Sequence, residues 1–435
     1  MTTSGLGTTT APIADKTWTV ENDRKVVSPV PSRSVAVDRG RAATASTGTA
    51  VTRLVRLNAN GAIDSRFTVG TGFNGSVYSV APAKGDNGYM YVGGRFTNYN
   101  GRGVTRLMRI NDDGVIDVNF NAGIGFSNAV YSVASAEDGS GDVYVGGRFS
   151  SYNGTAVVRL VRLNADGTVD TDFNVGTGFD GTVYTVAPAT DGSGDVYVGG
   201  QFSTYNGRAV TRLVRLNADG TIDADFMLGA GFDNTVWSVA PATGDSGDVY
   251  VGGAFTRYNG TAANYLVRLK ANGAIDVSFN VGMGMDHPVR SVAPAMDGSG
   301  DVYVGGWFTT YNGTVVNDLV RLNADGTIDL GFTVGTGCNG PVLSVAPATD
   351  GSGDVYVGGI FASYHGATVN DMARINGDDI GDAGLALETG VENIVRNVVS
   401  TTDGSGDVSV SGRRTVHKTI VGLRIMRLDA DGHPL

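Results

Sequence analysis

The stretch "RLVRLNADGTIDADF", from Arg212 to Phe226, decides the fold because the chain repeats it. Nearly identical stretches begin at Arg53 and Arg159. In each copy, two short runs rich in apolar and β-branched residues flank a turn-forming group such as Asn-Ala-Asp-Gly, a pattern typical of a tight β-hairpin. The repetition predicts a tandem array of such hairpins.

The repeat has a constant period of 53 residues. The arginine of "VRLN" and its equivalents stand at Arg56, Arg109, Arg162, Arg215, Arg268, Arg321, Arg374 and Arg427. Residues 51–421 hold seven copies, residues 12–50 resemble a degenerate copy, and residues 422–435 supply a closing strand. With residues 1–11 as an N-terminal tail, we expect one domain of eight repeats over residues 12–435.

Each repeat contains four strand signals and no long 3.6-residue period. "VYSVAPA" and "DVYVGGRF" come first, and "RLVRLN" and "TIDADF" follow. This order predicts an all-β fold, an eight-bladed β-propeller of four-stranded antiparallel blades closed by a strand from the N-terminus. The small residues of "SVAPA" are expected at the crowded centre. A seven-bladed propeller with an irregular N-terminal segment is the alternative.

A cross-strand ion pair is predicted within the repeated hairpin. The turn places Arg56 opposite Asp64, and later copies repeat the pair, as in Arg215 and Asp223. Such a pair contributes about 0.2–1 kcal/mol. If a strand from the N-terminus closes the propeller, Arg427 is predicted to pair with Asp15.

The phrases "LVRLNADGTVDTDF" and "VYVGGQFSTYNG" resemble the delta-60 repeat, a β-propeller repeat of bacterial proteins without an assigned function. The resemblance covers nearly the whole chain in order and spacing. It implies a propeller and a surface or exported setting, and it transfers no catalytic or binding residue.

Composition excludes several classes of function. The net charge is −11 and no basic run is present, so nucleic acid and anionic membranes are not expected partners. No apolar run has membrane-spanning length, so membrane insertion is not expected. The N-terminus lacks the pattern of a secretory signal. The expected location is the cell surface, the extracellular space or a particle, with the choice left open.

The sequence gives little sign of metal or catalytic chemistry. Asp138 and Asp142 stand in an acidic turn that resembles part of a calcium loop, but turn formation explains them equally well. The single cysteine, Cys338, replaces a repeated Phe and is expected to be packed. No Ser/His/Asp arrangement is recognisable. We therefore predict no cofactor, with calcium as the weak alternative, and no enzyme, with a hydrolase or lyase at the channel mouth as the alternative.

A binding face is predicted from positions that vary while their neighbours stay constant. One set follows "VGG" and another precedes the third strand; the loop residues Trp237 and His287 are expected near the same rim. These two sets include Arg95, Arg148, Gln201 and Trp307 in the first, and Tyr265, Asp318 and Asp371 in the second.

A tyrosine also recurs, at Tyr99, Tyr152, Tyr205, Tyr258, Tyr311 and Tyr364; we expect it to wedge between blades rather than to stack on sugars. Together, these patterns predict a non-enzymatic binding or scaffold module that presents one loop face to a protein or glycan. The alternative is a structural component of a virion, fibre or other surface assembly.

Overall fold

The computed structural model describes residues 53–84, 88–227, 229–244, 246–332, 335–369, 371–377 and 394–413. The chain divides into two units, Met1–Ala45 and Ser46–Leu435, and all described residues belong to the second. Within the described residues every regular element is a β-strand. They form seven three-stranded antiparallel sheets and six two-stranded hairpins.

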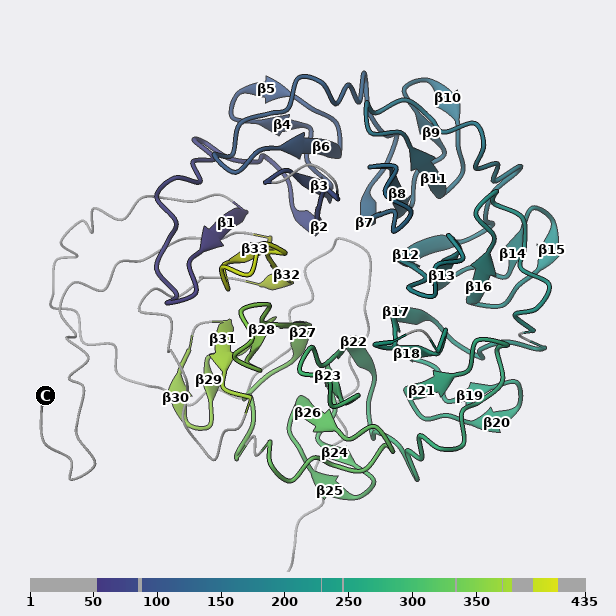
Figure 1. Cartoon of the computed structure of the whole chain (residues 1–435), viewed down its shortest axis with the longest axis vertical. Helices are drawn as coiled ribbons and strands as arrows, with labels where there is room; N and C mark the ends of the chain where they lie inside the picture. The colour runs from purple at the N-terminus through teal and green to yellow at the C-terminus, as the bar shows by residue number, and fades with distance from the viewer. Residues whose placement is uncertain are drawn as a thin grey trace, which may run out of the picture. The chain divides into compact units, whose positions relative to one another are not determined.

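The first strand of each sheet comes from the "VYSVAPA" phrase and lies nearest the common centre about which the sheets are arranged (Figure 1). These inner strands are β2 (Val77–Pro82), β7 (Val130–Ser135), β12 (Thr182–Pro188), β17 (Val236–Pro241), β22 (Val289–Pro294), β27 (Val342–Pro347) and β32 (Val395–Ser400).

The second strand of each sheet comes from the "VYVGG" phrase and the third from the "LVRL" phrase. The second strands are β3 (Met90–Gly94), β8 (Val143–Gly147), β13 (Val196–Gln201), β18 (Val249–Gly253), β23 (Val302–Gly306), β28 (Val355–Gly359) and β33 (Val408–Gly412). The third strands are β6 (Leu107–Ile110), β11 (Leu160–Leu163), β16 (Leu213–Leu216), β21 (Leu266–Leu269), β26 (Leu319–Leu322), β31 (Met372–Ile375) and β1 (Leu54–Leu57).

The predicted fourth strand is reduced to a single bridge, so the described sheets have three strands. In the repeat of β16, Leu216 bridges Ile222, and the amide of Asp223 donates to the carbonyl of Arg215 at 3.0 Å. The Asp223 carboxylate then accepts from the amide of Asp225 at 2.8 Å. This local bond turns the backbone away before a second pair of residues can join the ladder.

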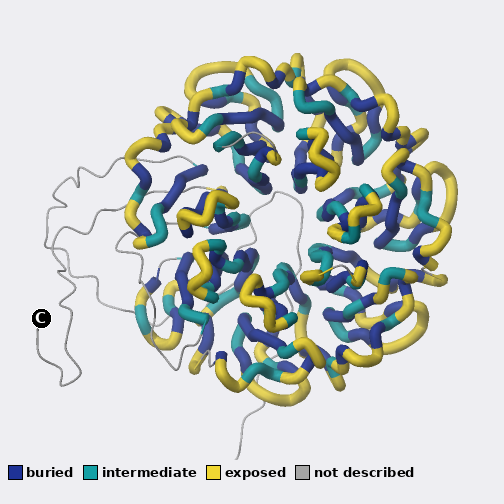
Figure 2. Tube along the Cα trace, viewed as in Figure 1, coloured by how far each residue is buried: buried dark blue, intermediate teal, exposed yellow. Residues whose placement is uncertain are grey.

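The loops that contain "STYNG" (residues 203–207) or its equivalents form short hairpins that the sequence patterns did not predict. They lie at the outer side of the sheets, where Figure 2 shows mostly exposed residues. The hairpins are β4 (Asn98–Tyr99) with β5 (Arg102–Gly103), β9 (Ser151–Tyr152) with β10 (Thr155–Ala156), β14 (Thr204–Tyr205) with β15 (Arg208–Ala209), β19 (Arg257–Tyr258) with β20 (Thr261–Ala262), β24 (Thr310–Tyr311) with β25 (Thr314–Val315), and β29 (Ser363–Tyr364) with β30 (Ala367–Thr368).

Neighbouring inner strands are joined by a repeated side-chain bond. The amide of Val133 on β7 donates to Oγ of Ser79 on β2 at 3.1 Å, and the same bond recurs at later boundaries. At the boundary between β32 and β2, Asn397 takes the place of the serine, and the amide of Val80 donates to its Oδ1 at 3.0 Å. The last and first described inner strands therefore meet as the others do.

The third strand of the last described sheet comes from the start of the described chain. Strand β1 pairs with β33 so that Leu54 faces Ser411 and Leu57 faces Val408. The eight-repeat scheme instead assigned this place to the "RLD" phrase that ends at Asp429 and paired residues 54–57 with the degenerate first copy. Sequence similarity could not predict which third strand pairs with β33, because the repeated third-strand phrases have nearly the same residues. The predicted pair of Arg427 and Asp15 lies outside the described residues.

The core consists of apolar layers between adjacent sheets. Val133 and Val145 of one sheet pack with Tyr91 and Leu107 of the sheet before it, and all four are buried. Close approach depends on the Gly-Gly pair of the second strand: a Cβ on Gly93 would lie 2.6 Å from Cγ1 of Val130 in the next sheet. The Gly-Gly pair therefore permits the close contact between neighbouring sheets.

The recurring tyrosine belongs to this core. Tyr205 is 2% exposed, packs on Phe179 with ring centroids 4.6 Å apart, and donates from Oη to the carbonyl of Gly220 at 2.6 Å. Cys338 occupies the Phe179 position of a later repeat and is also buried. Both residues therefore have the packing role expected from the sequence, and the sugar-stacking alternative for the tyrosines is excluded by their burial.

Candidate functional site

Each described inner strand has a β-bulge at the residue that follows its first valine. In the first sheet, Val77 pairs with Gly94 and Ser79 pairs with Gly93, so Tyr78 has no partner on β3. The same shift recurs in the other six described sheets. We call the extra residues the bulge residues: Tyr78, Tyr131, Tyr184, Trp237, Arg290, Leu343 and Arg396.

The bulge residues are half-buried and contact one another across sheet boundaries. Tyr131 stacks on Tyr78 with ring centroids 5.2 Å apart and meets Tyr184 at 5.4 Å. The guanidinium of Arg396 lies 5.3 Å from the ring of Tyr78, which joins the last described sheet to the first. The centre is thus lined by large side chains, contrary to the expectation that the small residues of "SVAPA" would fill it. The β-bulge explains this difference, because it changes the direction in which one side chain of each inner strand points.

A second set of residues, the collar residues, directly follows the last glycine of each described second strand: Arg95, Arg148, Gln201, Ala254, Trp307, Ile360 and Arg413. Backbone bonds fix them beside the inner strands; the amide of Arg148, for example, donates to the carbonyl of Ala129 at 2.9 Å. Burial raises the pKa of Tyr131, and the charges of Arg148 and Arg95 oppose that shift. These two collar arginines are therefore within electrostatic reach of the bulge residues.

One part of this region is a compact group of two tryptophans and one arginine. Trp237 and Trp307 meet edge to face with centroids 5.8 Å apart. The guanidinium of Arg290 lies 4.3 Å from the Trp237 ring centroid and 5.5 Å from that of Trp307. Burial, helped by the charge of Arg396, lowers the pKa of Arg290 to about 10.

The structure thus brings Trp237 together with Trp307 and places Arg95, Arg148 and Gln201 in the collar. Tyr265, Asp318 and Asp371 directly precede third strands, where all three have positive φ. Their carbonyls accept from the amides of Gly253, Gly306 and Gly359, each of which directly precedes a collar residue. Arginines at the same position reach toward the following repeat, as Arg159 does in donating to the carbonyl of Phe179. His287 is exposed and lies 3.3 Å from Asp286 in a loop. That these four residues share a binding face with the collar residues stays a prediction.

Asp318 has unusual surroundings for its position. Where the first four described copies have a half-buried arginine (Arg53, Arg106, Arg159 and Arg212), the carboxyl of Asp318 is half-buried beside Cys338. Burial, together with the charge of Asp286, raises the pKa of Asp318 to about 7. This carboxyl can therefore change charge near neutral pH.

The predicted ion pairs exist and are more extensive than expected. Arg56 lies 2.5 Å from Asp64, and Arg215 lies 3.4 Å from Asp223. Both arginines are buried, and Arg215 also contacts Asp191 at 2.6 Å. The pairs are thus parts of buried networks rather than isolated surface contacts.

The weak calcium candidates belong to the same kind of network. Asp138 and Asp142 lie 2.7 and 2.8 Å from Nη2 of Arg162. Burial alone would lower the pKa of Arg162, but Tyr144 and these carboxylates raise it above its ordinary value. A guanidinium therefore occupies the position in which calcium was considered. Among the residues described, no group of three or more His, Cys, Asp or Glu side chains is placed to hold a metal ion.

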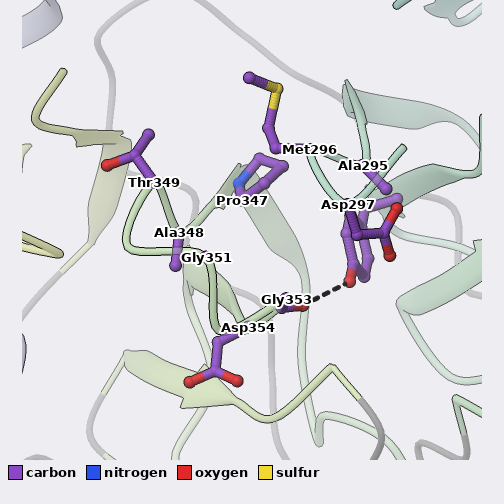
Figure 3. A pocket seen from close by; sticks show the side chains of 10 residues that line it. Ala295, Met296, Asp297, Pro347, Ala348, Thr349, Gly351, Gly353 and Asp354 are labelled. Carbon is purple, nitrogen blue, oxygen red and sulfur yellow. Dashed lines mark hydrogen bonds between the residues drawn. The ribbon is translucent and has the colours of Figure 1, made fainter. Parts of the chain in front are cut away.

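A shallow pocket lies between the turns of two adjacent sheets, near Pro347 (Figure 3). Its polar groups already have partners. Tyr303 donates from Oη to the carbonyl of Gly353 at 3.1 Å, and Asp354 pairs with Arg374 at 2.7 Å. The same tyrosine–glycine bond recurs at other boundaries, so the pocket is a feature of the scaffold.

Sequence reasoning missed most of the bulge residues, although a signal was available. In the otherwise constant phrase that begins each inner strand, the second position reads Tyr, Tyr, Tyr, Trp, Arg, Leu and Arg along the chain. A variable position within a constant core strand indicates that its side chain leaves the core.

Comparisons with known proteins agree with this architecture. The sequence model of a family described as "Domain of unknown function (DUF5122) beta-propeller" matches residues 42–67, 86–120, 139–173, 192–226, 246–279 and 298–332. The chain belongs to this family of propeller repeats. The DUF5122 matches recur at the period of the repeat and confirm the predicted resemblance to a β-propeller repeat without an assigned function.

None of the curated proteins compared with this DUF5122 chain matches it. Among solved structures, the WD40 β-propeller domain of Doa1 is 11% identical, with a TM-score of 0.43 over 76% of this chain and 98% of that domain. The extracellular domain of the hybrid two component system BT4673 from B. thetaiotaomicron is 15% identical, with a TM-score of 0.46 over 87% of this chain and 40% of that one. Neither likeness bears on function. No helix in the described part of the chain has the length and apolarity needed to cross a bilayer.

Proposed function

We propose that this protein is a non-enzymatic binding module, a seven-bladed propeller whose ligand binds at the bulge and collar residues. The pairing of β1 with β33 and the bond between Val80 and Asn397 support closure after seven blades. Closure makes the seven bulge positions converge on one centre. Preformed side chains on a stiff scaffold need little ordering on binding.

The observation that carries the proposal is the group of Trp237, Trp307 and Arg290. Tryptophan and arginine are the residue types most enriched among energetically dominant binding residues. Here both tryptophans come from positions where most other repeats have a different residue, while the scaffold around them stays constant. The indole Nε1 of Trp307 is buried without a hydrogen-bond partner in the described chain, so a donor is left for a ligand.

We propose that the protein has no catalytic role because its recurring carboxylates are ion-paired and its cysteine thiol is buried. The carboxylates that recur in the described repeats are engaged by arginines such as Arg162 and Arg321. Burial raises the pKa of the Cys338 thiol, with a further contribution from Asp318, which disfavours the nucleophilic thiolate.

The proposal is tested by screening the full chain on an array of neutral and acidic glycans and of peptides. We expect Trp307→Ala to abolish retention of whatever the wild type retains, because the aromatic anchor is lost. The matched control is Met296→Ala, which truncates a 65% exposed side chain at the pocket of Figure 3. Retention that depends on Met296 and not on Trp307, or an array to which the wild type does not bind, would contradict the proposal.

A further inference from the structure

The charge of the central region is opposite to that of the chain. The sequence has a net charge of −11, with 43 acidic residues and 32 Lys and Arg residues. Yet the bulge and collar positions include five arginines and no acidic residue. The five are Arg95, Arg148, Arg290, Arg396 and Arg413.

Arg290 and Arg396 differ from the other buried arginines in what surrounds them. The Nε atoms of both are buried and have no hydrogen-bond partner within the described residues. Nε of Arg106, Arg159 and Arg212 also has no hydrogen-bond partner in the described chain, but each of these side chains is held through another guanidinium nitrogen. For Arg290 and Arg396 the described contacts are aromatic rings instead.

The two guanidinium groups also act on each other. The positive charge of Arg396 adds to the effect of burial in lowering the pKa of Arg290. Leu343, on the inner strand between theirs, adds no charge. Two half-buried cations that contact aromatic rings and no carboxylate are unfavourable unless something else compensates them. An anion bound by either guanidinium would do so.

The available donors define the chemistry of that anion. Guanidinium groups present a planar fork of N–H donors that matches the oxygens of carboxylate, phosphate and sulfate. The Trp307 indole adds a further N–H donor. Its ring and that of Trp237 provide apolar surface beside the cations. We infer that Arg290 and Arg396 bind an oxyanion group of the ligand, while the tryptophans contact its carbon skeleton; this inference rests on the proposed function of the same residues.

The test is isothermal titration calorimetry of the full chain at pH 7.5 with phosphate, sulfate and glucuronate, each compared with chloride at equal ionic strength. We expect saturable binding of at least one oxyanion. Each of Arg290→Met and Arg396→Met should weaken it about tenfold or more, since a hydrogen bond to a charged group contributes about 1.5–3 kcal/mol. The three anions distinguish a carboxylated ligand from a phosphorylated or sulfated one.

The matched control is Arg257→Met, which removes an exposed arginine on β19 that donates to the carbonyl of Gly260. Binding should be unchanged in this variant, and circular dichroism should show that all three variants are folded. If Arg290→Met fails to fold, Arg396→Met carries the test alone. The inference is overturned if no oxyanion binds, or if Arg257→Met weakens binding as much as the central variants do.

Failure here can be told apart from failure of the proposed function. A neutral ligand that is retained by the wild type and lost in Trp307→Ala would support the binding module while overturning the oxyanion inference.

Discussion

Arg162 and Arg290 occupy repeated positions of the same scaffold but have opposite surroundings. Arg162 lies on a third strand with Asp138, Asp142 and Asp170 all within 3.1 Å. Arg290 lies on an inner strand, with its guanidinium beside two tryptophan rings that also contact each other. The Arg162 position is arginine in every described repeat, whereas the Arg290 position changes from Tyr to Trp, Arg and Leu. Constant, ion-paired positions such as Arg162 build the scaffold, and variable positions such as Arg290 are where we propose that a ligand binds.

The largest expected effect separates the two kinds of arginine directly. Arg162→Met should lower the free energy of unfolding by about 3–5 kcal/mol, because it leaves buried carboxylates without a counter-charge. Arg396→Met should change it by less than about 1 kcal/mol, because no buried carboxylate depends on that side chain. Denaturant unfolding followed by circular dichroism measures both. Equal losses in the two variants would remove the distinction.

A smaller, pH-dependent effect is expected at Asp318, where a carboxyl has replaced an arginine. Its pKa is raised from 3.8 to about 7 in the folded chain. The folded state therefore holds a proton that the unfolded state releases, and stability is lost as pH rises from about 4 to about 7. Asp318→Asn should be more stable than the wild type by roughly 1–3 kcal/mol at pH 8 and equally stable at pH 4.

The measurement is the unfolding midpoint of both proteins across this pH range. Asp325→Asn serves as the control, because hydrogen bonds from Thr327 lower the pKa of that exposed carboxyl and give it no loss of stability between pH 4 and 7. A constant difference between Asp318→Asn and the wild type at all pH values would show that folding does not raise the pKa of Asp318.

The smallest effect compares two tyrosines. Tyr205→Phe should cost about 1–2 kcal/mol of stability, since the buried carbonyl of Gly220 loses its donor. Tyr131→Phe should cost less than about 0.5 kcal/mol, because the half-buried bulge tyrosine keeps its ring contacts with Tyr78 and Tyr184. Thermal melts of the two variants are compared with the wild type. A larger loss in Tyr131→Phe would place the bulge residues in the scaffold.

Much of the scaffold could be predicted from the sequence, because its physical requirements recur every 53 residues. The alternation of strands, the Arg56–Asp64 pair and the packing of Cys338 all follow from local patterns. The assignment of Leu54–Leu57 to the last described sheet did not, since identical phrases compete for one strand edge. The bulge was also hidden, because the side-chain period of the inner strand shifts by one residue without any change in composition.

The candidate site was predicted only in part for the same reason. The predicted binding face included Trp307, Arg95 and Arg148 from their variation, and Trp237 as a loop residue near the rim, but not Arg413. The partners Arg290 and Arg396 lie 53 and 159 residues beyond Trp237. Only the convergence of the inner strands brings such positions together.

The most direct test of the central claim is a crystal structure of the full chain soaked in selenate, whose selenium gives an anomalous signal. The account predicts an anomalous peak within hydrogen-bond distance of the guanidinium groups of Arg290 or Arg396. Peaks confined to exposed outer arginines such as Arg257, with none at the bulge residues, would contradict it.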